Sequence, residues 1–359
     1  MSRRTRVMLI FGGRSAEHDV SRVTAVAVAK ALDPARYDVI PVAITTDGQW
    51  HAADDAAALL DAGAGTLPDA FPVAGTELVS LGEMVATSGR RGVDVDVVFP
   101  LLHGPFGEDG TVQGLLELAD VPYVGSGVLG SAVGMDKAMA KQVLSANNIP
   151  QAAYRSFRAH QITPGLPATL ADEMGLPLFV KPANMGSSVG VSKAKTVEEV
   201  RDAIDVALTY DEWVVVEEAI AGREIEVAVL GNLEPRASLP GEIVPGAEFY
   251  DYADKYLDDG SQTLVPAPLT QEQSDTVRAM ALQVFTVLRC EGLARVDFFL
   301  EENGRGFLCN EVNTMPGFTP ISMYPKMWIA SGLSYSDLID ELVRLALERH
   351  GRQRRNTAH

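Results

Sequence analysis

The sequence predicts an α/β protein of three domains, the first of which holds a doubly wound parallel sheet. Three observations lead to this fold class. The first third of the chain alternates short apolar runs with helical patterns, as parallel sheets do. The rhythm changes near residue 138 to a small α+β unit, and again near residue 223, which gives domains at 1–138, 139–223 and 224–359. At about 150 residues per domain, 359 residues agree with two or three domains.

In the first domain, near-continuous apolar runs predict buried strands, and apolar residues three or four apart predict helices. The expected strands are 6–11, 37–44, 95–102 and 122–124, and the expected helices are 21–32 and 111–119. The segment 53–89 is rich in Ala, Gly and Asp, and its pattern is too weak to assign a structure.

The same patterns divide the rest of the chain. A helix at 135–147 leads to strands at 178–182, 189–194 and 213–218 around a helix at 197–208. The last domain is expected to hold strands 224–230, 294–300 and 306–313 and helices 271–289 and 335–350. Between these elements, the polar and aromatic stretch 248–262 is typical of a functional loop.

Charge and composition exclude several classes of function. Lys and Arg number 30 against 48 Asp and Glu, so the formal charge is −18, and we expect no nucleic-acid or anionic membrane partner. Two cysteines cannot form a disulfide framework. No apolar run reaches the roughly 18 residues of a membrane span, and the start lacks the apolar stretch of a signal peptide. We therefore expect a cytoplasmic protein.

The last strand pair carries the strongest candidate for a metal site. Glu311 and Asn313 are two residues apart and therefore point to one face of a strand. A two-residue turn at 303–304 would set Val296 opposite Glu311 and turn Asp297 away. An odd-length loop, such as three residues with a bulge, would set Asp297 opposite Glu311. Two carboxylates and an amide oxygen suit Mg²⁺, whereas the alternative is a solvated polar strand face.

A second candidate site is the sequence from Leu178 to Gly190, in which a strand ends at Lys181 and a loop of small residues follows. Small residues allow backbone N–H groups to approach phosphate oxygens, and a lysine adds positive charge. The alternative is a Gly/Ser hairpin with an incidental lysine. The chain has no P-loop motif, and Gly12-Gly13 does not complete a dinucleotide motif.

Two polar loops follow apolar strands in the first domain and carry Glu17 and His103. Ligands of parallel α/β sheets bind beyond the carboxyl ends of the strands, where both residues fall. The alternatives are a helix N-terminus for Glu17 and a capping or core role for His103. Glu217 and Glu218 end another apolar run, which could offer backbone groups to a purine and a carboxylate to ribose.

Taken together and in this order, these motifs resemble the ATP-grasp superfamily, and within it the D-alanine–D-alanine ligase family. The likeness spans most of the chain and rests on seven stretches: 12–21, 103–110, 181–190, 217–224, 250–256, 295–297 and 311–322. The resemblance implies a three-domain ATP-grasp architecture, with ATP between the second and third domains and amino acids facing the first.

The resemblance also implies the residues that hold the nucleotide and the metal. By role they are Lys137 and Lys181 for the ATP phosphates, Lys255 for the γ-phosphate from a lid at 248–262, Glu217, Glu218, Ala219 and Ile220 for adenine, Glu224 for ribose, and Asp297, Glu311 and Asn313 for Mg²⁺ or Mn²⁺.

The amino-acid sites follow from the same resemblance. The implied residues are Glu17 for the ammonium of the first D-alanine, linked through Ser187 to Tyr256, His103 near that substrate, Arg295 and the Gly317 N–H at the reacting carbonyl, and Ser322 at the carboxylate of the second D-alanine.

The implied activity is ATP-dependent formation of D-alanyl-D-alanine for peptidoglycan precursors, through an acyl phosphate, by a homodimer. One alternative is a D-alanine–D-lactate ligase, which the intact tyrosine pattern at 250–256 disfavours. The other is a catalytically silent ATP-binding module, which has no need of the metal ligands together with Arg295.

Overall fold

The computed structural model describes residues 3–52, 95–245 and 262–353. Segment 53–89, the expected lid at 248–262 up to residue 261, and with it Lys255 and Tyr256, lie outside the described residues. The mixed α/β class expected from the sequence is confirmed, and the elements form three separate sheets. None of the helices in the described part of the chain combines the length and the hydropathy needed to cross a membrane.

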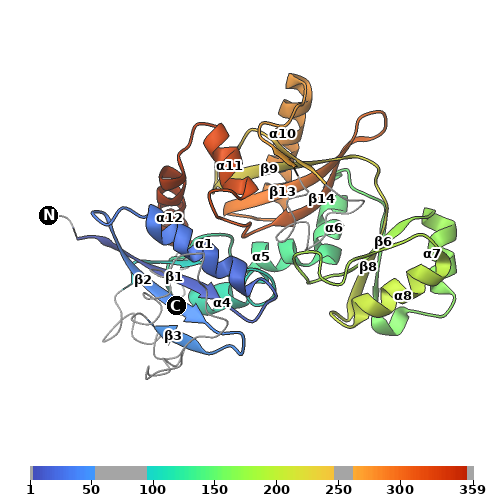
Figure 1. The fold of residues 1–359 in the computed structure, drawn as a ribbon, viewed down its shortest axis with the longest axis horizontal. Helices are drawn as coiled ribbons and strands as arrows, with labels where there is room; N and C mark the ends of the chain where they lie inside the picture. The colour runs from blue at the N-terminus through green and yellow to red at the C-terminus, as the bar shows by residue number, and fades with distance from the viewer. Residues whose placement is uncertain (1–2, 53–94, 246–261, 354–359) are drawn as a thin grey trace, which may run out of the picture.

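The N-terminal sheet has the strand order β3-β2-β1-β4 and lies at the lower left of Figure 1. Its strands are β1 (Thr5–Gly12), β2 (Tyr37–Ile44), β3 (Trp50–Ala52) and β4 (Val97–Pro100). β1 is parallel to β2 and β4, and β3 is antiparallel to β2. The chain therefore moves outward from β1 to β2 and returns to the other side of β1 at β4, so ligand-binding loops are expected where β1 and β4 end.

Helices cover both faces of the N-terminal sheet because the side chains of β1 alternate between them. Val7 and Leu9 pack with α1 (His18–Ala31), and Met8 and Ile10 pack with α4 (Thr111–Leu118). The expected strand at 122–124 is reduced to a single parallel bridge between Val98 and Tyr123.

Two helices connect the N-terminal sheet to the central one, where the sequence predicts a single helix at 135–147. α5 (Val128–Met135) ends at Asp136, and α6 (Lys137–Ala146) begins directly after it. The expected helix is confirmed as α6, and α5 before it was not expected. α6 starts only at Lys137 because Asp136 has an extended backbone and its side chain caps the helix by accepting a hydrogen bond from the Met139 N–H.

The central sheet has the antiparallel order β5-β8-β6-β7. Its elements are β5 (Tyr154–Arg158), α7 (Leu166–Met174), β6 (Leu178–Pro182), β7 (Ser192–Ala194), α8 (Val197–Leu208) and β8 (Trp213–Glu218), with a short 3₁₀ turn at Ala159–Gln161. Val180 and Val216 pack against the two helices. The alternate residues Lys181 and Glu217 therefore lie on the opposite face of the sheet.

The C-terminal sheet has the order β12-β11-β9-β13-β14, with β10 paired to β9. Its elements are β9 (Arg223–Gly231), β10 (Arg236–Ala237), β11 (Gly241–Val244), β12 (Gln262–Leu264), α10 (Gln271–Val287), β13 (Gly292–Glu301), β14 (Gly306–Asn313), α11 (Met323–Ala330) and α12 (Tyr335–Arg352). Val227 and Val296 face α10. On the other face, β13 carries apolar residues such as Leu293 near its start, and Arg295 and Asp297 follow along the same strand.

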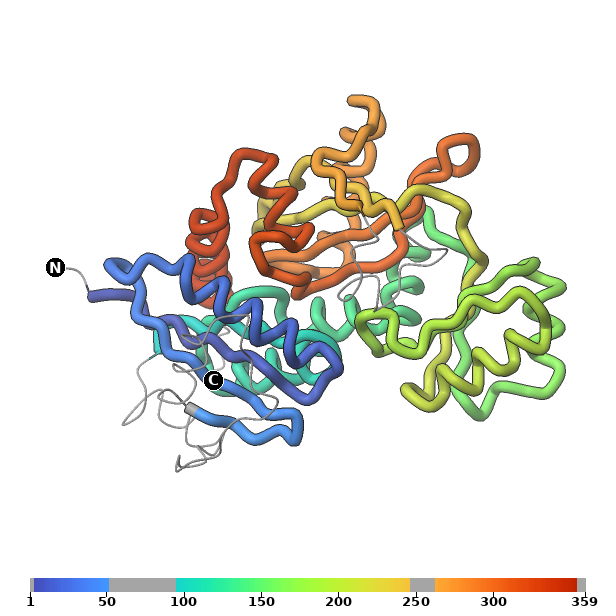
Figure 2. The backbone as a smooth tube through the Cα atoms, in the orientation of Figure 1, coloured from blue at the N-terminus to red at the C-terminus, as the bar shows by residue number. Residues whose placement is uncertain are grey.

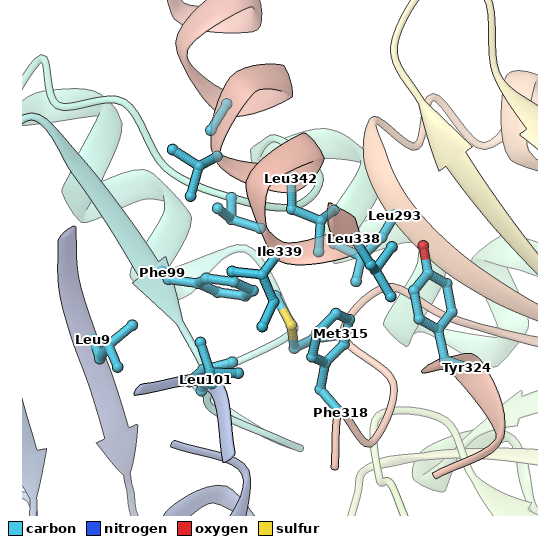
Figure 3. Close-up of a cluster of buried hydrophobic side chains, with 14 of the residues drawn as sticks. Leu9, Phe99, Leu101, Leu293, Met315, Phe318, Tyr324, Leu338, Ile339 and Leu342 are labelled. Carbon is cyan, nitrogen blue, oxygen red and sulfur yellow. The ribbon is translucent and has the colours of Figure 1, made fainter. Parts of the chain in front are cut away.

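The N-terminal and C-terminal sheets share one hydrophobic core. Leu9 and Phe99 from the first sheet pack with Phe318 and with Ile339 of α12, as the close-up in Figure 3 shows. The central sheet has its own core against α7 and α8 and stands apart in green in Figure 2. The domain boundaries at 138 and 223 stay a prediction, because one core joins parts of the first and third expected domains.

Replacing Phe318 with alanine tests this shared core. Phe318 is fully buried, and its ring centroid lies 5.9 Å from that of Phe99 and 5.6 Å from that of Tyr324. Phe318→Ala should lower the free energy of unfolding by about 3–5 kcal/mol, measured by urea denaturation. As a control, Leu118→Ala removes an exposed leucine and should change it by less than about 0.5 kcal/mol. Equal effects of the two substitutions would contradict the shared core.

Candidate active site

A cavity of about 510 Å³ lies between the central and C-terminal sheets. Its walls come from β6 and the loop after it, the end of β8, and strands β9, β13 and β14. The sequence-predicted residues at its surface are Lys137, Lys181, Ser187, Glu217, Glu218, Ala219, Ile220, Glu224, Arg295, Asp297, Glu311 and Asn313.

A β-bulge sets the register of the strands that form the floor. Near the turn, Glu301 pairs with Gly306 and Phe298 with Cys309, but on the far side Asp297 pairs with Glu311. The extra residue on β14 is Asn310. The alternative of an odd-length loop is wrong, because four residues join the strands and the shift arises within the ladder.

The bulge brings Asp297, Glu311 and Asn313 to one face. Asn313 Nδ2 donates to Asp297 Oδ2 at 2.9 Å, and Arg295 donates from Nε and Nη2 to the two Asp297 oxygens at 2.8 and 2.7 Å. Arg295 Nε also lies 3.2 Å from Glu226 Oε2. Burial lowers the pKa of Arg295, but the adjacent carboxylates raise it well above its ordinary value.

The donor chemistry of this face fits a hard cation that takes further ligands from phosphates. Glu224 and Glu226 of β9 line the same cavity as Asp297 and Glu311, which gathers carboxylates there. Among the residues that the structure describes, no group of three or more His, Cys, Asp or Glu side chains is arranged to hold a metal. Asp297, Glu311 and the Asn313 amide would therefore supply only some of the oxygen ligands of a metal ion. This is how Mg²⁺ binds at a nucleotide, where phosphates and waters supply the other ligands.

Lys181 and Glu217 form an ion pair on the opposite wall. Lys181 Nζ donates to Glu217 Oε2 at 3.0 Å and to Asn310 Oδ1 at 3.4 Å. The other Glu217 oxygen, Oε1, lies 3.3 Å from Nζ of Lys141 on α6. Burial raises the pKa of the Glu217 carboxyl, but the two ammonium groups outweigh it and lower the pKa to about 2. Burial lowers the pKa of Lys181, and Glu217 and Glu311 raise it above its ordinary value.

The small-residue loop after β6 is anchored from several sides. The Asn184 backbone N–H donates to Asp211 Oδ2 at 2.8 Å, and Asn184 Nδ2 donates to Asp136 Oδ2 at 3.2 Å. Lys137 Nζ donates to the Met185 carbonyl oxygen at 2.6 Å. Ser187 adopts φ of 48°, in the left-handed region that side chains rarely occupy. These contacts hold the loop beside the cavity rather than leaving it as an unconstrained hairpin.

Glu17 reaches this loop from the N-terminal unit. It is the N-cap residue of α1, but its side chain makes no capping hydrogen bond. Its carboxylate instead accepts a hydrogen bond from Ser187 Oγ. A Cβ on Gly186 would lie 2.9 Å from Glu17 Oε2, and one on Gly104 would lie 3.1 Å from it. Glu17 thus lies at a helix N-terminus, as the alternative expected, but its carboxylate is directed to Ser187, and glycines leave the space that this carboxylate occupies.

His103 is buried between the first and last units of the chain. Its Nδ1 lies 3.0 Å from the carbonyl oxygen of Met315 and 3.4 Å from Glu108 Oε1. Because a carbonyl only accepts, Nδ1 carries a proton. Burial lowers the pKa of His103, but the carboxylates of Glu108 and Glu17 raise it above its ordinary value. His103 thus lies in an acidic environment close to Glu17.

Gly317 and Ser322 lie together in the loop between β14 and α11. A Cβ on Gly317 would be 3.3 Å from Ser322 Oγ. Ser322 Oγ accepts from the Thr319 backbone N–H at 3.1 Å and is 2.8 Å from Thr319 Oγ1. Met315 and Phe318 fix the start of this loop in the shared core.

At the far end of the cavity, the Glu218 side chain is held by hydrogen bonds from residues that do not line the cavity. Its Oε1 accepts from the Ala153 backbone N–H at 2.7 Å and from Arg305 Nη1 at 2.6 Å. The Ala219 N–H donates to the Pro177 carbonyl at 3.2 Å. The segment from Glu217 to Ile220 therefore borders the cavity while its ends are tied to neighbouring strands.

Four polar residues of this region were not expected from the sequence: Glu108, Lys141, Glu226 and Asn310. The sequence carries a signal for two of these four residues. Lys141 lies one helical turn after Lys137, and Asn310 directly precedes Glu311. The other two have ordinary loop and strand contexts, so only the tertiary contacts identify them.

Comparison with known proteins identifies one family. Residues 6–126 match the family model described as D-ala D-ala ligase N-terminus, and residues 143–344 match the D-ala D-ala ligase C-terminus. The chain is 48% identical to a D-alanine–D-alanine ligase of Geobacillus thermodenitrificans, over 97% of this chain and 96% of that protein.

Two solved structures are also similar. A D-alanine–D-alanine ligase from Coxiella burnetii has a TM-score of 0.82 and 38% identity, covering 98% of this chain and 96% of that one. The VanG D-Ala:D-Ser ligase from Enterococcus faecalis has a TM-score of 0.84 and 34% identity, covering 96% and 100%.

The buried Glu217 carboxylate predicts a pH-dependent stability. Its folded pKa of about 2 lies below the ordinary 4.5, so its contribution is present above pH 4.5 and is lost as the pH falls toward 2. Glu217→Gln should lower the free energy of unfolding by about 3 kcal/mol at pH 7 and by less near pH 3.5, measured by urea denaturation. A difference that stays constant between these pH values would contradict the assignment.

Proposed function

The chain belongs to the D-alanine–D-alanine ligase family, and from this we propose that it joins two D-alanine molecules to D-alanyl-D-alanine with conversion of ATP to ADP and phosphate. The product would serve peptidoglycan precursor synthesis. The observation that supports this most directly is the cavity in which Lys181 faces a strand pair with Asp297 opposite Glu311. Positive groups and carboxylates meet there in the arrangement that phosphoryl transfer needs.

The nucleotide is proposed to lie between the central and C-terminal sheets. Lys137 and Lys181 would bind the phosphates, and the anchored loop after β6 would offer backbone N–H groups. The segment from Glu217 to Ile220 would hold adenine, and Glu224 would hold the ribose hydroxyls. Lys255 and the lid at 248–262 remain part of the proposal by resemblance.

Asp297, Glu311 and Asn313 are proposed to hold Mg²⁺, with Mn²⁺ as an alternative. When bound, the metal would neutralise charge on the phosphate oxygens. Arg295 holds Asp297 through Nε and Nη2 and so fixes the orientation of that carboxylate.

The first D-alanine is proposed to lie near Glu17, which would pair with its ammonium group. Ser187 orients that carboxylate by donating a hydrogen bond, and His103 would lie near the same substrate. Tyr256 completes the implied link to Ser187. The second D-alanine would place its carboxylate at Ser322, beside Gly317.

The reaction would proceed in two displacements. A carboxylate oxygen of the first D-alanine attacks the γ-phosphorus, the bond to the β-phosphate oxygen breaks, and ADP leaves with formation of an acyl phosphate. The deprotonated amine of the second D-alanine then attacks the acyl carbon, and phosphate leaves as the amide forms. The Gly317 N–H and the remaining Arg295 donors would stabilise the tetrahedral oxyanion. Because acyl phosphates hydrolyse readily, closure over the cavity would also exclude water.

A homodimer in the cytoplasm completes the proposal. The homodimer follows from the family resemblance, and the cytoplasm follows from the composition and is where ATP is available. Size-exclusion chromatography with light scattering measures the first of these directly.

Product analysis tests the proposed substrates. With ATP and D-alanine, we expect phosphate release that depends on D-alanine and yields the dipeptide. D-lactate or D-serine should compete poorly as second substrate, and D-serine is included because one similar structure is a D-Ala:D-Ser ligase. A depsipeptide as the main product would favour the D-alanine–D-lactate alternative, and phosphate release independent of D-alanine would contradict ligation.

Asp297→Ala tests the metal assignment. Removing one oxygen ligand should lower kcat by about 10²-fold or more, because charge on the transferred phosphoryl group loses part of its compensation. Asp205→Ala, on the exposed face of α8, is a matched control that should keep normal turnover. Circular dichroism would verify that both variants fold. Turnover of Asp297→Ala within threefold of the unmodified protein would refute the assignment.

A further inference from the structure

Lys141 is a buried charged residue that the proposed mechanism does not use. It lies on α6 and is only 2% exposed. Its Nζ is 3.3 Å from Glu217 Oε1 and 5.4 Å from the centroid of the Tyr154 ring. Since Lys137 precedes it by four residues, both lysines project from the same side of α6 toward the central unit.

Glu217 is shared between two lysines. Its Oε1 faces Lys141 and its Oε2 accepts from Lys181 Nζ at 3.0 Å. The three side chains therefore carry one negative and two positive charges, a net charge of +1. If Lys141 were neutral, Glu217 would compensate the charge of Lys181 fully, and the net charge of the group would be zero.

We propose that Lys141 is a positioning residue: by sharing the Glu217 carboxylate it leaves the Lys181 ammonium available to the phosphates of ATP. This inference rests on the proposed function, since it assigns Lys181 to ATP phosphates. Lys141 itself would not touch the nucleotide. Its effect would pass through Glu217 to Lys181.

The burial of Lys141 supports a role for its charge rather than for its bulk. Removing a charged group from water is costly, and apolar residues of similar volume often replace buried ion pairs without loss of stability. The neighbouring residues Ala138, Ala183 and Val215 form a small apolar cluster that a methionine could extend. A packing role would thus be filled as well by an uncharged side chain, whereas control of the Glu217 charge requires a cation.

A double-mutant cycle distinguishes these roles. Lys141→Met changes the net charge of the group to 0, Glu217→Gln changes it to +2, and the double variant returns it to +1. We expect Lys141→Met to raise the KM for ATP by about tenfold, which corresponds to about 1.4 kcal/mol. The KM for D-alanine should change by less than about twofold. In the Glu217→Gln background, Lys141→Met should change the ATP KM by less than about threefold, because Glu217 then no longer holds Lys181.

Lys141→Arg is the matched control because it keeps the charge, and its ATP KM should stay within about threefold of the unmodified value. The unfolding free energy of every variant is measured in parallel. If Lys141→Met does not fold, Lys141→Gln enters the cycle with the same expectation. Two results would overturn the inference. One is a change in ATP KM in the double variant that equals the product of the two single changes, and the other is an unchanged ATP KM in Lys141→Met.

Direct ATP binding to the unmodified protein, measured by calorimetry, separates this inference from the proposed function. Failure of the unmodified protein to bind ATP would remove the proposed function itself. Normal ATP binding and turnover with no coupling between positions 141 and 217 would overturn only the role of Lys141.

Discussion

One extra residue in a β-ladder determines the chemistry of the cleft. The bulge at Asn310 moves β14 by one position relative to β13, and this sets Asp297 opposite Glu311. Without that shift, Glu311 would lie opposite Val296 and point with it into the apolar core beneath the sheet, because strand side chains alternate between faces. The same bulge leaves Asn310 within reach of Lys181, so one local irregularity connects the C-terminal strand pair to the central sheet.

The surroundings of the cleft depend on a hydrophobic core that the first and last thirds of the chain share. Met315 and Phe318 are buried in this core and fix the loop that carries Gly317 and Ser322. The Met315 carbonyl in turn meets His103 from the N-terminal unit. Groups proposed to bind amino acids are therefore positioned by packing between segments far apart in the chain. The central unit, with a separate core, contacts them through the hydrogen bond from Ser187 to Glu17.

Electrostatics within the cleft differ from those of the whole molecule. The chain carries a formal charge of −18, yet its proposed phosphate site gathers lysines around the single carboxylate of Glu217. Burial strengthens these local interactions because the effective dielectric constant is lower than in water. On the opposite wall, Arg295 partly compensates Asp297 and Glu226. An acidic protein can thus present both a cationic wall to phosphates and an oxygen-rich wall to a divalent cation.

The sequence by itself determined the mixed α/β class, many of the element bounds, such as those of β6 and β8, and the motif positions, because apolar periodicity and turn residues act locally. It placed Glu311 and Asn313 on one face for the same reason. Only the tertiary structure decided that Asp297 joins them, that α6 starts after the cap at Asp136, and that Lys141 meets Glu217. A register shift, a cap and a buried ion pair depend on partners distant in sequence or on single-residue backbone geometry, and periodicity carries no information about either.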